Sequence, residues 1–477
     1  MQAKTLVVLS ILMIAGTLWF ALGGREDRAV LNELARRQVE QETAASDRDA
    51  LASTATTFRL SNRLTAEQVS SDPLWLVERR PSGSSLELPF RPLSKGSLPA
   101  QEASIRSQPD DAQTLAYENP GYLGAAACAE CHIDKYSGFT QTAHHQTSGN
   151  LTAANALGRF ASPANQMVTE KGDLEFLMTK RDNRVYQQAS LEDWKMEFPM
   201  DIVTGSGKVG QSYLYWLDDK LYQLHVSYLT GVDEWVTSPG YAEDTAHYAR
   251  KIGHRCLECH TTWIAPKTQG DDNVYYRDSA IWGISCERCH GPGREHVEFH
   301  RRHPEARTAK YVTHPGDLPR QRQLDICGQC HSGSFMLLQD AFSYRPGQDL
   351  SEYHKLYDQS RKEIGGIHTS NQLMRMSMSE CFKQSNMTCT SCHNPHKNQR
   401  GDVAAFTASC LNCHESQHCG MSDQLGDRIT QDCVSCHMPM SDNEGMSFEV
   451  SKGSFNVQMV DHYIRVDREA TAKVLDE

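Results

Sequence analysis

Cysteine and histidine recur in this 477-residue chain in one short pattern. With 16 Cys and 21 His, the pattern Cys-x-x-Cys-His should occur about 0.02 times by chance. It occurs seven times, with first cysteines at positions 128, 256, 286, 327, 389, 410 and 433. Two thiols three positions apart can form thioether bonds to one porphyrin, and the adjacent His can bind its iron. The pattern therefore predicts seven covalently attached haem c groups.

Each motif assigns the same three roles to its residues. The predicted thioether cysteines are Cys128, Cys131, Cys256, Cys259, Cys286, Cys289, Cys327, Cys330, Cys389, Cys392, Cys410, Cys413, Cys433 and Cys436. The predicted proximal iron ligands are His132, His260, His290, His331, His393, His414 and His437. Zinc is the main alternative, but a zinc site needs no His after every second Cys, and seven pairs do not divide into two-pair sites.

The other axial position of each iron needs a second ligand. Of the 21 histidines, seven belong to the motifs, which leaves fourteen for bis-His coordination. His396 lies three residues after His393 and cannot reach the opposite face of the same haem, so it would bind a neighbouring one. His296 follows His290 across a Gly-Pro-Gly turn, and the same argument applies. Local context favours His144, His296, His396 and His462 as distal ligands and leaves His145, His225, His254, His314, His354 and His418 undecided.

Two cysteines, Cys381 and Cys419, lie outside the motifs. Haem is attached to thiols outside the cytoplasm, where leftover thiols tend to pair. We therefore favour a disulfide between them. Two unpaired buried cysteines are the alternative, because sequence alone does not fix connectivity.

The first residues indicate export. Leu6–Leu22 is an uncharged apolar run of 17 residues, which lies between the length of a signal-peptide core and that of a spanning helix. Residues 1–24 are therefore a signal anchor or a signal peptide. An uncleaved anchor is slightly favoured, which would place the protein in the periplasm or another extracytoplasmic space, attached to the cytoplasmic membrane.

The motifs divide the rest of the chain. Residues 25–120 contain a helical pattern and then a Pro- and Ser-rich stretch, which predicts a stalk and linker. Residues 121–470 form the expected heptahaem domain, with a β insert at about 170–240 in the long first interval. There, alternating segments at 212–217 and 221–228 flank a turn and predict a hairpin. The later intervals are too short for cores of their own, so the porphyrins must supply one.

Composition supports this fold class. Apolar residues make up only 39% of the chain, charged residues 23%, and mean hydropathy is −0.56, which excludes a polytopic membrane protein. The net charge of −12 argues against nucleic acid as a partner. We expect a mainly α multihaem cytochrome c fold with little regular secondary structure and a small β-hairpin insert.

Several segments also carry a family resemblance. They are Ser238–Tyr241, Cys286–His296, Ser379–Phe382, Cys389–His396, Cys413–Cys419, Cys433–Pro439 and Asp461–Ile464. In these residues the chain resembles the hydroxylamine oxidoreductase superfamily of multihaem c-type cytochromes, and more closely a subgroup often fused to tetratricopeptide repeats. The resemblance implies a mostly helical fold around packed haems. It also implies that His144, His296, His368, His396 and His462 are distal ligands and that Cys381 and Cys419 are a family feature.

The chain departs from this family pattern in three respects. It ends at Glu477 without repeats, and no motif has Lys in place of His, the replacement that marks the active haem of ammonia-forming nitrite reductases. Ser451–Met459 contains no His, although the pattern usually has another one upstream of His462. One haem could therefore lack a distal ligand.

Two functions are consistent with these features. The first is electron transfer, in which mostly bis-His haems relay electrons between a respiratory donor and an acceptor protein, with the membrane as a further partner if the N-terminal segment is retained. The alternative is an oxidoreductase that acts on a small nitrogen or sulfur compound at one five-coordinate haem. The sequence favours the carrier and assigns no catalytic residue.

Overall fold

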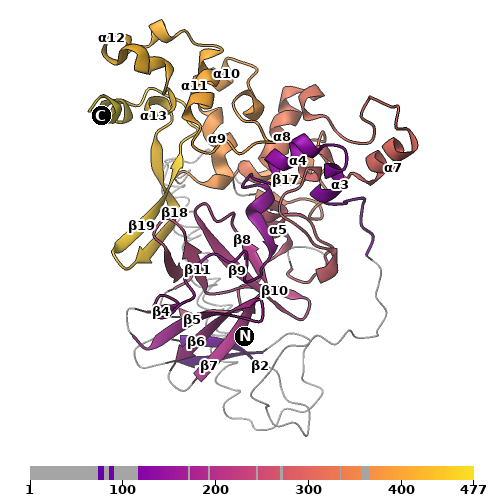
Figure 1. Ribbon diagram of the computed structural model, residues 1–477, viewed down its shortest axis with the longest axis vertical. Helices are drawn as coiled ribbons and strands as arrows, with labels where there is room; N and C mark the ends of the chain where they lie inside the picture. Colours follow the sequence, from indigo (N-terminus) through magenta and orange to yellow (C-terminus); the bar gives the residue numbers. More distant parts are fainter. Residues whose placement is uncertain are drawn as a thin grey trace, which may run out of the picture. The chain divides into compact units, whose positions relative to one another are not determined.

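The computed structural model describes residues 74–79, 85–90, 117–169, 172–191, 194–242, 245–268, 272–333, 335–356 and 366–476 (Figure 1). The export segment Leu6–Leu22 and most of the expected stalk at 25–120 lie outside these residues. In the part of the chain that is described, no helix is long and apolar enough to cross a bilayer. The chain divides into two compact units, Met1–Val77 with Phe90–Gly96, and Glu78–Pro89 with Ser97–Glu477. All seven motifs lie in the second unit.

A four-stranded antiparallel sheet forms part of the insert between the first two motifs. Its strands are, in order, β4 (Gln166–Val168), β5 (Leu174–Arg181), β6 (Arg184–Leu191) and β7 (Trp194–Met200). In β5, Leu174 and Phe176 are buried and Glu175 is exposed, the alternation of a strand with one covered face. Asp182 and Asn183 join β5 to β6 with positive φ, as a two-residue type I′ turn requires.

A second sheet completes the insert. Its order is β12 (Glu234–Thr237), β11 (Val226–Leu229), β9 (Gly210–Leu217), β8 (Ile202–Thr204) and β3 (Ser148–Asn150), and β10 (Lys220–Gln223) also pairs with β9. The β9–β10 turn contains Asp218 with a φ of 52°, at the expected turn. The insert is larger than the small hairpin expected from the sequence. The expected strand at 221–228 is two strands, β10 and β11, and β11 is buried along its whole length and pairs with both β9 and β12.

Short helices carry the motifs. Four of them end at the motif His: α5 (His254–His260), α6 (Glu287–His290), α8 (Arg320–His331) and α13 (Val434–His437). The other described α-helices are α3 (Ala125–Ala129), α4 (Ile133–Phe139), α7 (Arg294–Arg302), α9 (Gln372–Ser377), α10 (Glu380–Lys383), α11 (Val403–Leu411), α12 (Ser422–Leu425) and α14 (Arg468–Asp476). Gly291 ends α6 with a φ of 84°, which a residue with a side chain rarely adopts.

The remaining strands are short except for one hairpin. They are β1 (Leu74–Arg79), β2 (Ser85–Phe90), β13 (Thr245–Ala246), β14 (Thr261–Trp263), β15 (Ile281–Trp282), β16 (Phe335–Leu337), β17 (His354–Leu356), β18 (Met440–Val450) and β19 (Gly453–Val460). Strands β18 and β19 pair as a long antiparallel hairpin, yellow in Figure 1. It leads the chain directly to Asp461 and His462.

Helix and strand are present in comparable amounts, 31% and 26%. The expectation of a mainly α fold is therefore not supported, and the β insert and the later hairpins account for the difference. Buried apolar side chains are concentrated in the insert, where one cluster contains Trp216, Trp263 and Tyr275. Among described residues 366–476, the buried apolar side chains are only Ile367, Met376, Cys436, Phe448, Val457 and Ala470. The motif-rich C-terminal part thus has little apolar core of its own.

Candidate haem-binding sites

Each motif forms one helical turn. In five motifs the N–H of the motif His donates to the C=O of the first Cys over 2.9–3.1 Å, and the other two motifs lie inside α5 and α8. Positions i, i+3 and i+4 share one face of a helical turn. Both thiols and the imidazole of a motif therefore project to the same side, as attachment to one porphyrin requires.

Thiols of different motifs lie next to one another. Pairs within hydrogen-bonding reach are Cys128 with Cys286, Cys259 with Cys330, Cys327 with Cys389, and Cys410 with Cys433. Burial raises the pKa of Cys289 to about 11, and the nearby Cys330 thiol adds to this shift. Burial also raises the pKa of the Cys392 thiol, and the nearby Cys413 thiol adds to this shift. The seven motifs are thereby connected without interruption.

Four motif histidines each face a His from outside the motifs. The ring centres are 6.4 Å apart for His132 and His296, 6.1 Å for His290 and His396, 6.1 Å for His331 and His144, and 6.0 Å for His393 and His462. A metal–imidazole bond of about 2 Å places the metal about 3 Å from the ring centre, so two rings on opposite sides of one iron have centres about 6 Å apart. In all four pairs the spacing matches, and the residues present therefore fit a bis-His haem.

These pairs join different parts of the sequence. His396 faces His290 rather than the adjacent His393, and His296 faces His132 rather than His290. This is the exchange between neighbouring haems that the short spacings require. The imidazole planes lie within 22° of parallel in three pairs, whereas those of His331 and His144 are at 69°.

Backbone carbonyls and burial set the protonation of these rings. The Nδ1–H groups of His290, His296 and His331 donate to the C=O groups of Thr313, Lys310 and Thr369 over 2.6–2.8 Å. Because a carbonyl only accepts, each Nε2 keeps a lone pair for a metal. Burial also lowers the pKa of His144 and of His462 to about 4, so both imidazoles are neutral at neutral pH.

Comparison with known proteins found three matches to parts of this chain. The family model of cytochrome c554 and c-prime matches residues 235–291, which contain the second and third motifs. The multiheme cytochrome MtrA of Shewanella baltica (strain OS185) is 24% identical over 215 residues, 41% of this chain and 59% of that protein. The chain is a multihaem c-type cytochrome. The crystal structure of the outer cell wall cytochrome OcwA matches with a TM-score of 0.48 and 17% identity, over 74% of this chain and 82% of that one. The narrower assignment to the hydroxylamine oxidoreductase superfamily stays a prediction.

Three motif histidines of this multihaem cytochrome lack such a partner. All 21 histidines are among the described residues, yet none of these rings stands opposite His260, His414 or His437 at the spacing of the four pairs. His368, which the resemblance implies as a distal ligand, faces no motif His. Its Nδ1 accepts the N–H of Ser370 at 3.1 Å, which places its proton on Nε2.

The structure does not join the two cysteines outside the motifs. Both Cys381 and Cys419 are free thiols. Cys381 lies near Cys392, and Cys419 lies near Cys433 and Cys436. The favoured disulfide is therefore absent from the structure, because each cysteine sits beside a different motif.

Sequence reasoning missed a group of buried polar residues between the motif cysteines. Glu258, Arg288 and Gln329 occupy the variable positions of the second, third and fourth motifs, and all three are buried. Gln329 donates to the C=O of Arg288 at 3.2 Å, and Arg288 donates to the C=O of Glu258 at 3.0 Å. These bonds tie three motifs together. The charged residues Glu258 and Arg288, at the same position of successive motifs, were the signal in the sequence that could have indicated this group.

Proposed function

We propose that this cytochrome transfers electrons between redox partner proteins outside the cytoplasm through seven covalently bound haems. The single observation that carries the proposal is that each motif has a cysteine close to a cysteine of at least one other motif, so that all seven form one connected group. Electron tunnelling falls steeply with distance, so cofactors attached to adjoining thiols exchange electrons rapidly. When bound, haem iron would supply the one-electron redox couple.

The thiol contacts give an order for this transfer. The first motif adjoins the third through Cys128 and Cys286, and the third adjoins the fourth through Cys289. The fourth adjoins the fifth, from which the series continues to the sixth and seventh. The second motif joins as a branch, because Cys259 contacts Cys330 of the fourth.

The first motif and the sixth, the last but one of this series, have exposed residues. Cys131 and His132 are exposed at the first motif, and Cys413 and His414 are exposed at the sixth. Partner proteins could therefore approach these two motifs without opening the fold. We propose a respiratory donor and an acceptor protein as these partners, and the segment Leu6–Leu22, which lies outside the described residues, as the means of export and attachment.

The protein's own residues prepare the irons for this role. His132, His290, His331 and His393 would be the proximal ligands with an opposite imidazole, supplied by His296, His396, His144 and His462. An imidazole on each side favours six-coordinate iron, which changes charge with little rearrangement. Hydrogen bonds from Nδ1 to backbone carbonyls hold the ring planes and raise the basicity of the ligand.

Haem loading is tested by intact mass after expression with a cytochrome c maturation system. We expect the chain to gain the mass of seven haems, each resistant to acid-acetone extraction. Replacing Cys256 and Cys259 by alanine should remove one of the seven, whereas the same change at Cys381 and Cys419 should remove none. A mass equal to that of the bare polypeptide would contradict the proposed function.

A specific observation keeps a second function open. The unpaired histidines His260, His414 and His437 leave three irons for which the described residues offer no second imidazole. A small nitrogen or sulfur compound could bind and react at one of these positions. High-spin ferric signals that become low-spin on adding cyanide would support this enzyme; seven low-spin haems without cyanide would exclude it.

The angles between paired imidazoles predict the low-temperature EPR spectrum. When the two axial imidazole planes are nearly parallel, the ferric haem gives a rhombic low-spin signal. When the planes are steeply crossed, it gives a low-spin signal with a much larger maximum g value. We expect the haem held by the crossed pair His331 and His144 to give the signal with the large maximum g value. His144→Ala should convert this signal to high-spin, while His145→Ala, at the adjacent position, should leave it unchanged. If the large-g signal persists in His144→Ala, the pairing is wrong.

A further inference from the structure

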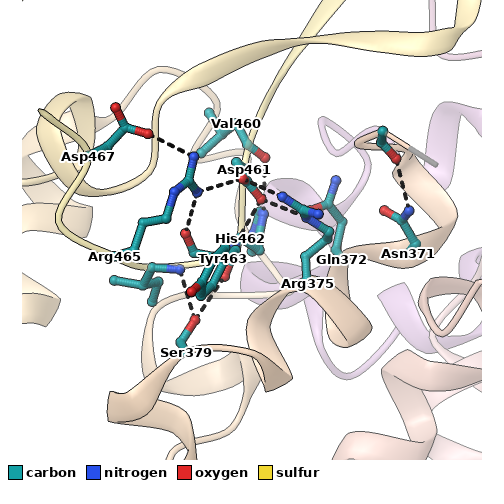
Figure 2. Close-up of polar contacts among 12 residues, drawn as sticks. Asn371, Gln372, Arg375, Ser379, Val460, Asp461, His462, Tyr463, Arg465 and Asp467 are labelled. Carbon is teal, nitrogen blue, oxygen red and sulfur yellow. Dashed lines mark hydrogen bonds and ion pairs between the residues drawn. The ribbon is translucent and has the colours of Figure 1, made fainter. Parts of the chain in front are cut away.

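Asp461 has a buried carboxylate that accepts four hydrogen bonds close to the seventh motif. It is 1% exposed, and each oxygen accepts two hydrogen bonds (Figure 2). Oδ1 accepts from Arg375 Nε and from the N–H of Tyr463, both at 2.9 Å. Oδ2 accepts from the second Arg375 nitrogen at 2.6 Å and from Arg465 at 2.7 Å. A buried carboxylate with all its acceptor positions filled is a rigid anchor.

On one side this anchor holds His462. The N–H of Asp461 donates to the C=O of Pro439 at 3.0 Å, and Ser379 bonds to the backbone on the other side of His462. The backbone is therefore fixed both before and after the histidine. Its ring lies 6.0 Å from that of His393 in the fifth motif, at an angle of 20°.

On the other side the anchor holds His437, the motif His of the seventh motif. Its Nδ1–H donates to the C=O of Arg465 at 2.9 Å, and the N–H of Arg465 donates back to the C=O of His437 at 3.2 Å. The Arg465 side chain is clamped between Asp461 and Asp467. Asp461 thus acts on His437 through the residue whose carbonyl orients that imidazole.

We propose that Asp461 is a positioning residue for two axial histidines at once, His462 at the fifth motif and His437 at the seventh, and that it sets the potentials of both haems together. The inference rests on the proposed haem binding. Geometry supplies the first effect, because both imidazoles depend on backbone that Asp461 fixes. Charge supplies the second: without the carboxylate, Arg375 loses its anionic partner and Arg465 keeps only Asp467, so net positive charge remains beside both histidine segments and disfavours the ferric state.

The test is Asp461→Asn in the full-length, haem-loaded protein, followed by EPR and a spectroscopic redox titration. We expect two low-spin EPR components to change their g values and two redox steps to move to higher potential, with the other haems unaffected. The matched control is Asp442→Asn. Asp442 loses the same charge and accepts hydrogen bonds from Asn456 and Gln458 in the same hairpin, but contacts neither histidine segment.

A second variant separates geometry from charge and guards against poor folding. Arg375→Lys keeps the positive charge but cannot form the two-point contact, so the fifth-motif g values should shift while the potentials change little. Wild-type spectra and potentials in both variants would overturn the proposal, as would an equal change in every haem. Absence of covalent haem from the wild-type protein would instead contradict the proposed function, so the two failures are distinguishable by mass.

Discussion

Replacing Cys327 and Cys330 together by alanine is expected to break electron transfer through the protein more severely than the same change at any terminal motif. The fourth motif adjoins the second through Cys259, the third through Cys289 and the fifth through Cys389. No other motif has three neighbours among the thiol contacts of the described residues. Its loss removes the thiol contacts that join the first three motifs to the last three among the described residues.

The measurement is a stopped-flow reduction with less reductant than haem. In the wild-type protein the electrons should redistribute over all haems within the fast phase. The variant should show one haem fewer by mass and a redistribution slower by orders of magnitude. The matched control, Cys410→Ala with Cys413→Ala, also loses one haem but lies toward one end of the series and should keep the fast phase among the first five motifs. Equal redistribution rates in both variants would show that transfer bypasses the fourth motif.

The attachment residues could be found from the sequence because each motif is local. Two cysteines and a histidine within one helical turn share a face whatever surrounds them. Distal ligands are harder, because they come from distant segments. Steric exclusion alone required His296 and His396 to serve other haems, and the structure places both opposite other motifs. The resemblance also implied His368, but its Nδ1 accepts a local hydrogen bond from Ser370, and its ring faces no motif His.

The fold was less accessible than the site. The alternating aromatic and aliphatic residues identified the hairpin around Asp218, although most of both strands is buried. This alternation did not identify the three-residue strand β8, and it did not separate β10 from β11, because Leu224 and His225 between them are also buried and leave no break in the pattern. The anchor at Asp461 was equally hidden, because its arginine partner Arg375 lies 86 residues away. Long-range polar contacts leave no periodic signal in one sequence.

Expression without haem attachment is expected to leave residues 366–476 unfolded while the β insert stays folded. Ordering a residue costs about 1.5 kcal/mol, whereas fully burying a large apolar side chain contributes about 1.5–3 kcal/mol. The C-terminal part buries only six apolar residues of its own, several of them small, whereas the insert contains dense clusters such as that around Trp216. Four of the seven motifs begin after position 320. Their porphyrins must therefore replace the missing side-chain core.

Hydrogen exchange measured by mass spectrometry resolves the two regions in one protein. In a chain with all fourteen motif cysteines changed to alanine, amides of β5, β6 and β9 should retain most of their protection, and those of α11, α13 and the β18–β19 hairpin should exchange at close to the unfolded rate. The haem-loaded wild type serves as the control and should protect both regions. Protection of α11 and α13 in the haem-free chain would mean that polar networks such as that of Asp461 and Arg375 hold this part together without porphyrin. Loss of protection in β5 and β6 as well would mean that the insert depends on the haems, and that its apolar clusters are not an independent core.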